Sequence, residues 1–315
     1  MAPYSTPRRS VLINREPDLS VTIAGVKFRN PVIAASGTFG YGSEYEGLLS
    51  IAGLGGICTK GLTLGSRPGN NGMRLHETPS GLMNSIGLEN PGIPAFLEDE
   101  LPRLRKLGPV IIANLSGSSV NEYAQGARLL DVQEVDMIEL NISCPNAKGS
   151  GIIFGLDPEI AASVTREVRR AAPHKPLMVK LSPNAPDLAA VAQSCADAGA
   201  DALSLVNTFK ALAIDINKRK PVFDNTSAGL SGPAIRPIAL RMVWELFEAV
   251  KIPIVGLGGI ASANDALEFL LAGARAVEVG SATFAHPLLM NEVVTGIRDY
   301  MKEKGFMETG RLSIR

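Results

Sequence analysis

The chain has 315 residues, of which 45% are hydrophobic and 20% charged, enough to bury the core of one large α/β domain or two small ones. Lysine plus arginine and aspartate plus glutamate number 31 each, so no overall basic field favours binding of nucleic acid. The three cysteines, Cys58, Cys144 and Cys195, lack CxxC or CxxH spacing, which excludes the usual sequence patterns of a disulfide framework, a zinc site or an iron–sulfur site.

Residues 1–20 are predicted to be a polar arm. The opening "MAPYSTPRRSVLINREPD" has no apolar run of the length that a signal peptide or a membrane span needs. We therefore expect a cytoplasmic protein that contacts neither membrane nor nucleic acid.

Short runs rich in β-branched residues then alternate with helix-like segments. These segments include 157–172, 185–200, 263–274 and the stretch around Trp244, with Pro, Asp or Ser near their starts and Gly near several ends. Near-continuous apolar strands in repeated βα units indicate a parallel sheet. About eight such units in roughly 250 residues favour a closed (β/α)₈ TIM barrel, with 1–315 as a single domain, over an open doubly wound sheet. The expected strands are 31–36, 55–61, 110–115, 137–143, 177–182, 202–207, 252–258 and 276–281.

Three further segments fit around this barrel. Residues 19–30, "LSVTIAGVKFRN", are expected to form a hairpin that plugs the barrel floor. Residues 61–92 and 207–233 are too long for ordinary connections. Long excursions at one face of a barrel are usually functional loops.

Polar residues or glycines close all eight expected strands, and strand ends are where a barrel builds its active site. Any one of them could simply be an ordinary polar strand end. Lys60 and Lys180 are expected to reach one cavity, which implies an anionic ligand or a charge that develops during a reaction. A Schiff-base aldolase is one alternative, because a desolvated lysine is its nucleophile. The closing residues are Ser36, Lys60, Asn114, Asn141, Lys180, Asn207, Gly258, Gly259, Gly280 and Ser281.

The last two expected strands contain a glycine pattern with two readings. Gly256, Gly258 and Ala261 match GxGxxA, and Glu278 follows at a distance that suits a Rossmann dinucleotide site. A Rossmann unit normally opens its domain, whereas this one comes last. We therefore favour a phosphate site, formed by backbone N–H groups after strands seven and eight, that a cofactor such as FMN would fit.

Cys144 stands apart from the other two cysteines. A buried, inert thiol is the ordinary expectation, and we apply it to Cys58 and Cys195. Cys144 follows an expected barrel strand in the loop "SCPNAKGSG", which could fold over the mouth. Although a free thiol is only slightly ionised at neutral pH, it can act as a general base or a nucleophile.

Together these motifs resemble the dihydroorotate dehydrogenases, class 1 in particular. The resemblance lies in "ELNISCPN" (139–146), "LMNSIGLENPG" (82–92), "GLSGPAIRP" (229–237) and "GLGGI" (256–260), and it extends over nearly the whole chain. Class 2 enzymes have a serine base, where this sequence has Cys144. They also have a membrane-associating N-terminal extension, which we do not expect here. A dihydropyrimidine dehydrogenase barrel shares a similar cysteine loop and is the nearest rival.

The resemblance implies an FMN-bearing barrel that oxidises (S)-dihydroorotate to orotate in pyrimidine synthesis. Cys144 would remove the C5 proton while hydride leaves C6 for the flavin, and Lys180 would stabilise negative charge on the reduced ring. No metal is expected. The implied FMN residues are Ser36, Lys60, Gly61, Asn114, Asn141, Lys180, Val206, Gly232, Gly258, Gly259, Gly280 and Ser281, the last where a threonine is usual. The implied substrate residues are Lys60, Asn84, Ser85, Ile86, Gly87, Leu88, Asn141, Asn207 and Thr208.

The excursion 207–233 resembles class 1B more than the fumarate-using class 1A. Class 1B implies a homodimer at the core of a heterotetramer, with a partner subunit that carries FAD and a [2Fe-2S] cluster and passes electrons to NAD⁺. An exposed apolar patch near the barrel mouth would receive that partner. The alternatives are a fumarate-dependent class 1A-like dimer and an inactive flavin-binding assembly subunit.

Overall fold

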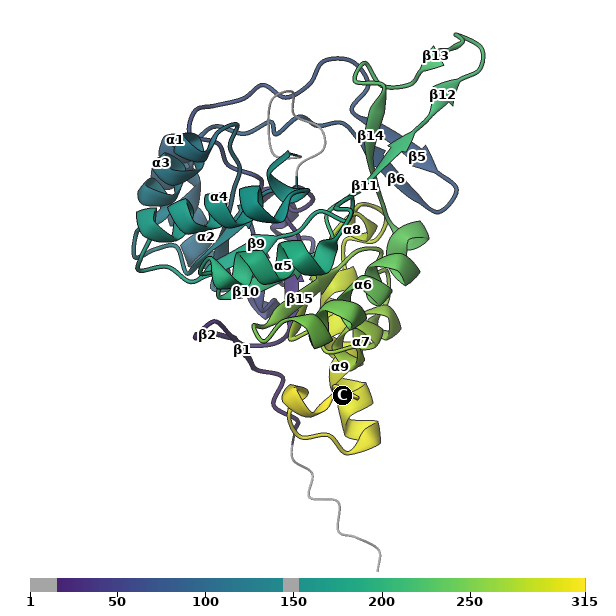
Figure 1. Ribbon diagram of the computed structural model, residues 1–315. Coiled ribbons are helices and arrows are strands. Elements are labelled where there is room, and N and C mark those ends of the chain that lie inside the picture. Colours follow the sequence, from purple (N-terminus) through teal and green to yellow (C-terminus); the bar gives the residue numbers. More distant parts are fainter. Residues whose placement is uncertain (1–15, 144–152, 315) are drawn as a thin grey trace, which may run out of the picture.

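Eight parallel strands close into a barrel in the computed structural model, which describes residues 16–143 and 153–314 (Figure 1). Each strand pairs with the next along the chain and the last pairs with the first, so the predicted (β/α)₈ barrel is confirmed. The barrel strands are β3 (Val32–Ala34), β4 (Gly56–Cys58), β7 (Val110–Leu115), β8 (Met137–Asn141), β9 (Leu177–Lys180), β10 (Ala202–Leu205), β15 (Ile254–Leu257) and β16 (Ala276–Val279).

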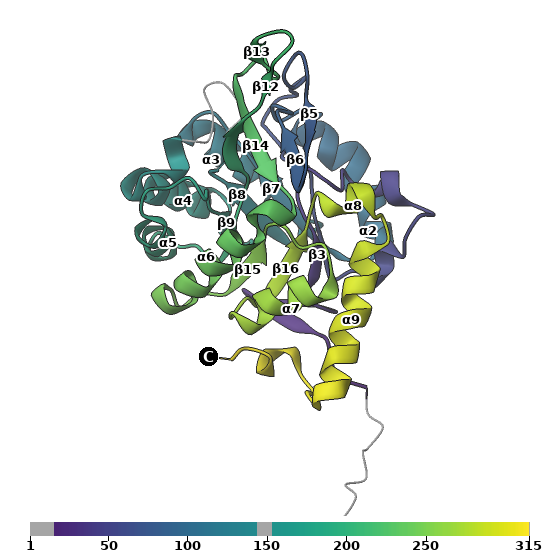
Figure 2. The same cartoon turned by 90° about the vertical axis from the view of Figure 1, so that its right-hand side faces the viewer.

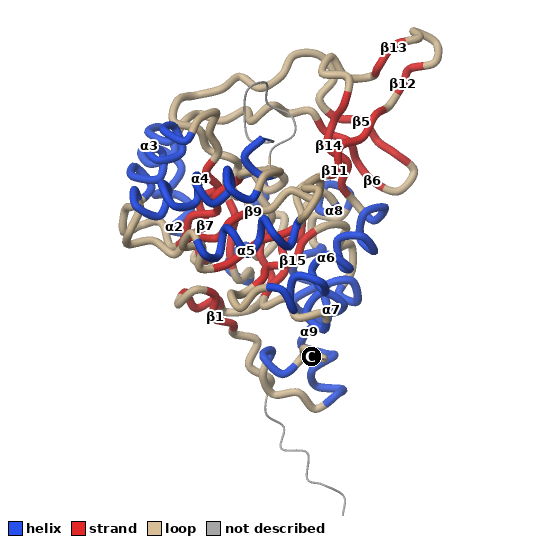
Figure 3. The backbone as a smooth tube through the Cα atoms, viewed as in Figure 1, coloured by secondary structure: helices blue, strands red, loops and turns tan. Residues whose placement is uncertain are grey.

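Helices surround the barrel (Figure 3), and several of them begin at a side-chain cap. The side chains of Ser119, Asp157, Asp187 and Ser262 each accept a hydrogen bond from the backbone N–H three residues later, which satisfies a donor that the first helical turn leaves unpaired. The helices are α1 (Ile93–Ala95), α2 (Leu101–Leu107), α3 (Val120–Leu130), α4 (Pro158–Ala171), α5 (Leu188–Asp197), α6 (Arg236–Ala249), α7 (Ala263–Leu271), α8 (Ala282–Ala285) and α9 (Leu289–Lys304), with a π-helical turn at Phe96–Glu100 between α1 and α2.

The barrel floor is closed by the predicted hairpin, strands β1 (Val21–Ile23) and β2 (Val26–Phe28). Val21, Ile23 and Phe28 are buried in one apolar cluster with the inward residues of all eight barrel strands. Those barrel residues are Ile33, Cys58, Ile112, Met137, Met178, Ala202, Val255 and Ala276. This apolar cluster therefore fills the amino-terminal end of the barrel.

The two long excursions pair with each other above the mouth (Figures 1 and 2). They form an antiparallel sheet in the order β11 (Phe209–Leu212), β14 (Ser227–Ser231), β6 (Gly81–Asn84) and β5 (Leu75–Thr78). A short pair, β12 (Ile214–Asp215) and β13 (Lys220–Pro221), extends beyond it. The position of these segments matches the prediction, but they contain a sheet as well as loops.

Several expected strands end earlier than their apolar runs suggest. Strand β3 ends at Ala34, β10 at Leu205 and β16 at Val279, each two residues before the predicted end. The residues between the observed and the predicted ends lie outside the strands, and they line the mouth of the barrel. The Rossmann alternative is wrong, because the strand that carries Gly256 pairs inside a closed barrel.

Within the described ranges, no helix combines the length and the apolar character that crossing a bilayer would require.

Replacement of Ile23 by alanine should destabilise the protein by about 2–5 kcal/mol, because it leaves a cavity in a floor that cannot collapse. Ile23 is fully buried between the hairpin and the barrel strands. Ile238→Ala, on the exposed side of α6, is the matched control and should change the free energy of unfolding by about 0.5 kcal/mol or less. Equal effects of the two substitutions in chemical denaturation would contradict the role of the plug.

Candidate active site

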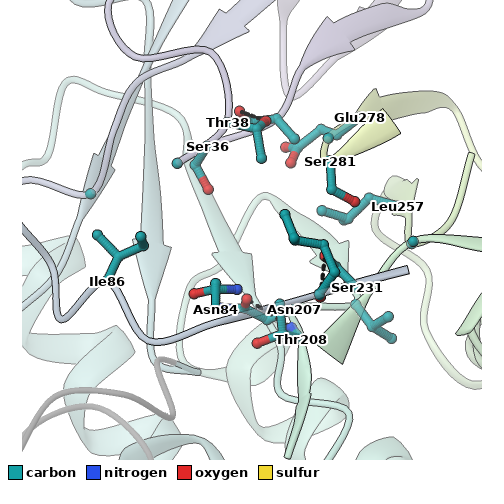
Figure 4. A pocket seen from close by; sticks show the side chains of 18 of the residues that line it. Ser36, Thr38, Asn84, Ile86, Asn207, Thr208, Ser231, Leu257, Glu278 and Ser281 are labelled. Atoms are coloured by element: carbon teal, nitrogen blue, oxygen red, sulfur yellow. Dashed lines mark hydrogen bonds between the residues drawn. The ribbon is translucent and has the colours of Figure 1, made fainter. Parts of the chain in front are cut away.

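A cavity of about 250 Å³ lies at the carboxyl end of the barrel strands, beneath the sheet formed by the two excursions (Figure 4). Its wall combines strand ends with residues of that sheet, such as Asn84 and Ser231. The predicted site residues that line it are Ser36, Lys60, Gly61, Asn84, Ile86, Gly87, Leu88, Asn114, Asn141, Lys180, Val206, Asn207, Thr208, Gly232, Gly258, Gly259, Gly280 and Ser281.

A layer of buried polar side chains forms the bottom of the cavity. Side chains alternate across a strand, so the residue two positions beyond each floor residue also points inward. On β8 this residue is Glu139, on β9 Lys180 and on β16 Glu278. The corresponding residues, two positions beyond the floor residue, are Asn114 on β7 and Ser204 on β10. The cavity thus rests on charged and polar groups, which in turn rest on the apolar floor.

Lys180 is the cation of this layer. Its Nζ lies 2.9 Å from Oε2 of Glu278, 3.4 Å from Oε2 of Glu139 and 3.2 Å from Oγ of Ser36. The side chain of Lys180 is 3% exposed, and both carboxylates are fully buried. Burial lowers the pKa of Lys180, but the two carboxylates outweigh burial and raise it, so the ammonium stays charged.

The two carboxylates differ in their partners. Glu139 accepts hydrogen bonds from Cys58, Asn114 and Ser204 as well as from Lys180. Burial raises the pKa of Glu139, but Lys180 and the donors outweigh this effect and lower it. Burial and the charge of Glu139 raise the pKa of Glu278 to about 8, against the attraction of Lys180.

The ligand atoms of Cys58, Glu139 and Glu278 lie within 4.8 Å of one another, which is close enough to hold a metal ion. The ammonium of Lys180 already contacts both carboxylates and supplies a positive charge there. Burial, followed by the charges of the two carboxylates, raises the pKa of the Cys58 thiol well above its usual range, so the thiolate that binds metals is disfavoured.

Amide side chains form a second network on the cavity wall. Nδ2 of Asn141 donates to Oδ1 of Asn114 (3.3 Å), and Oγ of Ser143 donates to Oδ1 of Asn141 (3.0 Å). Asn207 donates to Oγ of Ser143 (2.8 Å) and accepts from the backbone N–H of Thr208 (2.8 Å). Fixed amides of this kind suit a planar ligand that carries both donors and acceptors.

Glycines line the edge of the cavity formed by the last strands. A Cβ atom on Gly259 would lie 2.6 Å from the carbonyl oxygen of Gly232, and Gly259 has φ of +77°. Gly232 and Gly258 also have positive φ, and Gly280 continues the edge beyond β16. The backbone is thus free of side chains where Ser281 precedes α8, as close approach to a phosphate requires.

Lys60 lies higher in the cavity than Lys180. Its Nζ is 3.5 Å from Oε2 of Glu89, which also pairs with Arg74 at 3.1 Å. The side chain of Lys60 is 28% exposed. This lysine can therefore meet a ligand that enters from solvent, whereas Lys180 meets only what is bound at the bottom.

Two predicted site residues are not placed on the cavity wall. Ser85 is buried behind it, with its hydroxyl hydrogen-bonded to Asn70 and Asn225. Cys144 lies outside the described residues. Cys58 and Cys195 are free and buried, and burial raises the pKa of Cys195 to about 11, so the expectation of inert thiols agrees with their environment.

Sequence reasoning missed the two carboxylates of the lower layer. The sequence patterns include Glu139 only as part of an expected strand and Glu278 only as part of the possible Rossmann pattern. The available signal was a glutamate within an otherwise apolar strand, "MIELN" and "AVEVG". The cavity also includes Thr38 and Phe284, which the sequence motifs did not indicate.

Comparison with known proteins decides the family. A family model described as dihydroorotate dehydrogenase matches residues 18–301. The chain belongs to the dihydroorotate dehydrogenase family. It is 57% identical to a relative from Petrotoga mobilis over 91% of this chain and 96% of the relative. It is 51% identical to one from Geotalea daltonii over 94% of this chain and 97% of the relative. Both relatives are named dihydroorotate dehydrogenase B (NAD(+)), catalytic subunit, which confirms the predicted resemblance to class 1B.

The raised pKa of Glu278 predicts how stability depends on pH in the ligand-free protein. Between the ordinary glutamate pKa of 4.5 and about 8, the folded state holds a proton that the unfolded chain releases. The free energy of unfolding should therefore fall as the pH rises through this interval. Glu278→Gln should remove this part of the slope, and Glu245→Gln, on the exposed side of α6, should retain it. Identical slopes for Glu278→Gln and wild type in denaturant titrations would contradict the burial argument.

Proposed function

We propose that this chain oxidises (S)-dihydroorotate to orotate with FMN, as the catalytic subunit of a complex that passes the electrons to NAD⁺. The observation that carries the proposal is 57% identity, over nearly the whole of both chains, to a relative named dihydroorotate dehydrogenase B (NAD(+)), catalytic subunit. The cavity supports it independently, since it combines a glycine edge, fixed amides and two lysines at different depths.

The residues present fit FMN. Bound FMN supplies the ring that accepts a hydride. The glycine edge with Ser281 would hold its phosphate through backbone N–H groups. Lys180 would lie against the ring and stabilise negative charge there, because its ammonium is buried, charged and fixed by two carboxylates. The glycines at 232, 258 and 259 allow the close approach that side chains would prevent.

Dihydroorotate would lie higher, against the amides. Asn84, Asn141 and Asn207 can donate to and accept from the polar groups of its ring, and Lys60 would pair with its carboxylate. Ile86, Gly87 and Leu88 line the same wall, and Thr208 follows Asn207. These groups would bind and orient the substrate above the flavin and exclude water from between them.

Cys144 would be the general base that takes the C5 proton. Its neighbour Ser143 is buried and hydrogen-bonded to Asn141 and Asn207, which both line the cavity.

A partner subunit carrying FAD and a [2Fe-2S] cluster would complete the electron path, around a homodimer of this chain. Leu212 at the end of β11, Ile214 in β12 and Ile216 between β12 and β13 are 54%, 59% and 82% exposed. Isoleucine and leucine side chains this exposed are typical of protein–protein contacts. They support the expected apolar docking surface. That the complex works in the cytoplasm stays a prediction.

Cys144→Ala should leave FMN bound but slow reduction of the flavin by dihydroorotate about 10²- to 10⁴-fold, the usual contribution of a positioned general base. Cys195→Ala is the matched control, because Cys195 is buried in α5, away from the cavity, and its loss should leave the rate unchanged. Rapid-mixing absorbance measurements give both rates. Near wild-type reduction by Cys144→Ala would exclude this cysteine as the base.

Lys60→Met and Lys180→Met should have different consequences. Loss of Lys60 should mainly weaken dihydroorotate binding, since its ammonium faces the open part of the cavity. Loss of Lys180 should lower the flavin potential, because the positive charge beside the ring disappears. Substrate titration and potentiometry separate the two. An unchanged potential in Lys180→Met would remove its proposed role.

The isolated chain should reduce an artificial dye but neither NAD⁺ nor fumarate efficiently. No CxxC pattern suits a cluster in this chain, so electron transfer to NAD⁺ requires the partner. Steady-state turnover with each acceptor, with and without the partner subunit, tests this. Efficient NAD⁺ reduction by the chain alone, or fumarate as the best acceptor, would overturn the class 1B assignment.

A further inference from the structure

Glu278 is a buried carboxylate that the proposed reaction does not use. One oxygen, Oε2, lies 2.9 Å from Nζ of Lys180. The other, Oε1, is buried and has no hydrogen-bond partner among the residues that the structure describes. Glu278 is 1% exposed and lines the cavity, where Figure 4 shows it close to Ser281. A buried carboxylate oxygen without a donor is costly unless it carries a proton.

The neighbouring carboxylate cannot take that proton as readily. Glu139 shares the same lysine but also accepts from Cys58, Asn114 and Ser204, so its ionised form is well solvated by the protein. The ammonium of Lys180 therefore faces Glu139, which stays ionised, and Glu278, which can carry a proton. The net charge of the layer is −1 when Glu278 is ionised and zero when it is protonated.

The strands on either side of β16 leave this balance unchanged. Glu278 lies in register with Leu257 of β15 and with Ile33 of β3, and both side chains are apolar. The titratable groups that face Glu278 in the described part of the barrel are Lys180, Glu139 and Cys58. Cys58 remains a neutral thiol because burial raises its pKa. Any further control over the proton on Glu278 must come from the ligand in the cavity.

We propose that Glu278 takes up a proton when negative charge develops on a flavin bound above Lys180, so that Lys180 neutralises the flavin instead of a second carboxylate. This inference rests on the proposed function, because it requires FMN in the cavity. Glu278 acts through Lys180 and is therefore a positioning residue. Proton uptake would make the flavin easier to reduce than it would be beside a Glu278 that stayed ionised, without a large change in the buried charge.

The proton balance is simple. The hydride from the substrate carries both electrons of the reduction, and Glu278 accepts none. The additional proton comes from solvent water or buffer, and an O–H bond forms on the Glu278 carboxylate. Reoxidation reverses the step and returns the proton to solvent. Burial and Glu139 raise the pKa of Glu278 to about 8 without ligand, and one added negative charge raises it further, so proton uptake is expected from about pH 8 upward.

The test is the midpoint potential of bound FMN between about pH 6 and about pH 10, on either side of that pKa. In wild type and in the surface control Glu245→Gln, the midpoint potential should fall with pH more steeply than flavin reduction alone requires, by up to about 30 mV per pH unit. One more proton per two electrons changes the equilibrium tenfold per pH unit. Glu278→Gln should lose this additional slope. The potential of this variant should match wild type at the acid end and exceed it at the alkaline end.

A constant offset between Glu278→Gln and wild type at every pH would overturn the inference, since a merely structural role moves the potential equally throughout. Wild-type protein gives a second test if the variant loses flavin or fails to fold. Infrared difference spectra near pH 8 should gain a protonated carboxylic acid band when the flavin is reduced, and the absence of that band would also overturn it. Failure to bind FMN, or failure of dihydroorotate to reduce it, would instead reject the proposed function.

Discussion

The closure of the barrel by pairing between β16 and β3 is the constraint on which the site depends. Val277 lies opposite Val32, and Val279 opposite Ala34, although the two strands are separated by most of the chain. All eight strands run in the same direction, so their carboxyl ends meet at one face. Closure therefore brings Ser36 from the first strand and Ser281 from the last to the same cavity. An open sheet would leave these residues at opposite edges.

The alternation of side chains along the strands then divides the barrel interior into levels. The inward residue near the start of each strand packs on the hairpin and forms a dry floor. The inward residue two positions later is polar on β7, β8, β9, β10 and β16. Burying these charges is tolerable because they satisfy one another, with Lys180 between Glu139 and Glu278. Above them the strands end, and the loops supply amides and glycines.

The eight-stranded barrel, its plug and the cavity residues at the strand ends could be predicted from the sequence, because strand ends can be located from local apolar runs. The cavity residues outside the strand ends, such as Asn84, Val206 and Gly232, were predicted from the family resemblance. Three features were not predicted. Glu139 and Glu278 belong to a level that only the inward register identifies. The orientation of Ser85 depends on contacts with Asn70 and Asn225 in the folded excursions. The sheet over the mouth requires Met83 to pair with Leu230, a contact between distant segments that local propensity does not encode.

The central claim is that this cavity recognises dihydroorotate and delivers its hydride to FMN. The most direct measurement is an anaerobic titration of the flavin-loaded protein with dihydroorotate beside dihydrouracil, which lacks the carboxylate that Lys60 would bind. The account predicts that dihydroorotate bleaches the visible flavin absorbance and that dihydrouracil does not. Flavin that stays oxidised with dihydroorotate, or that both compounds bleach equally, would contradict it.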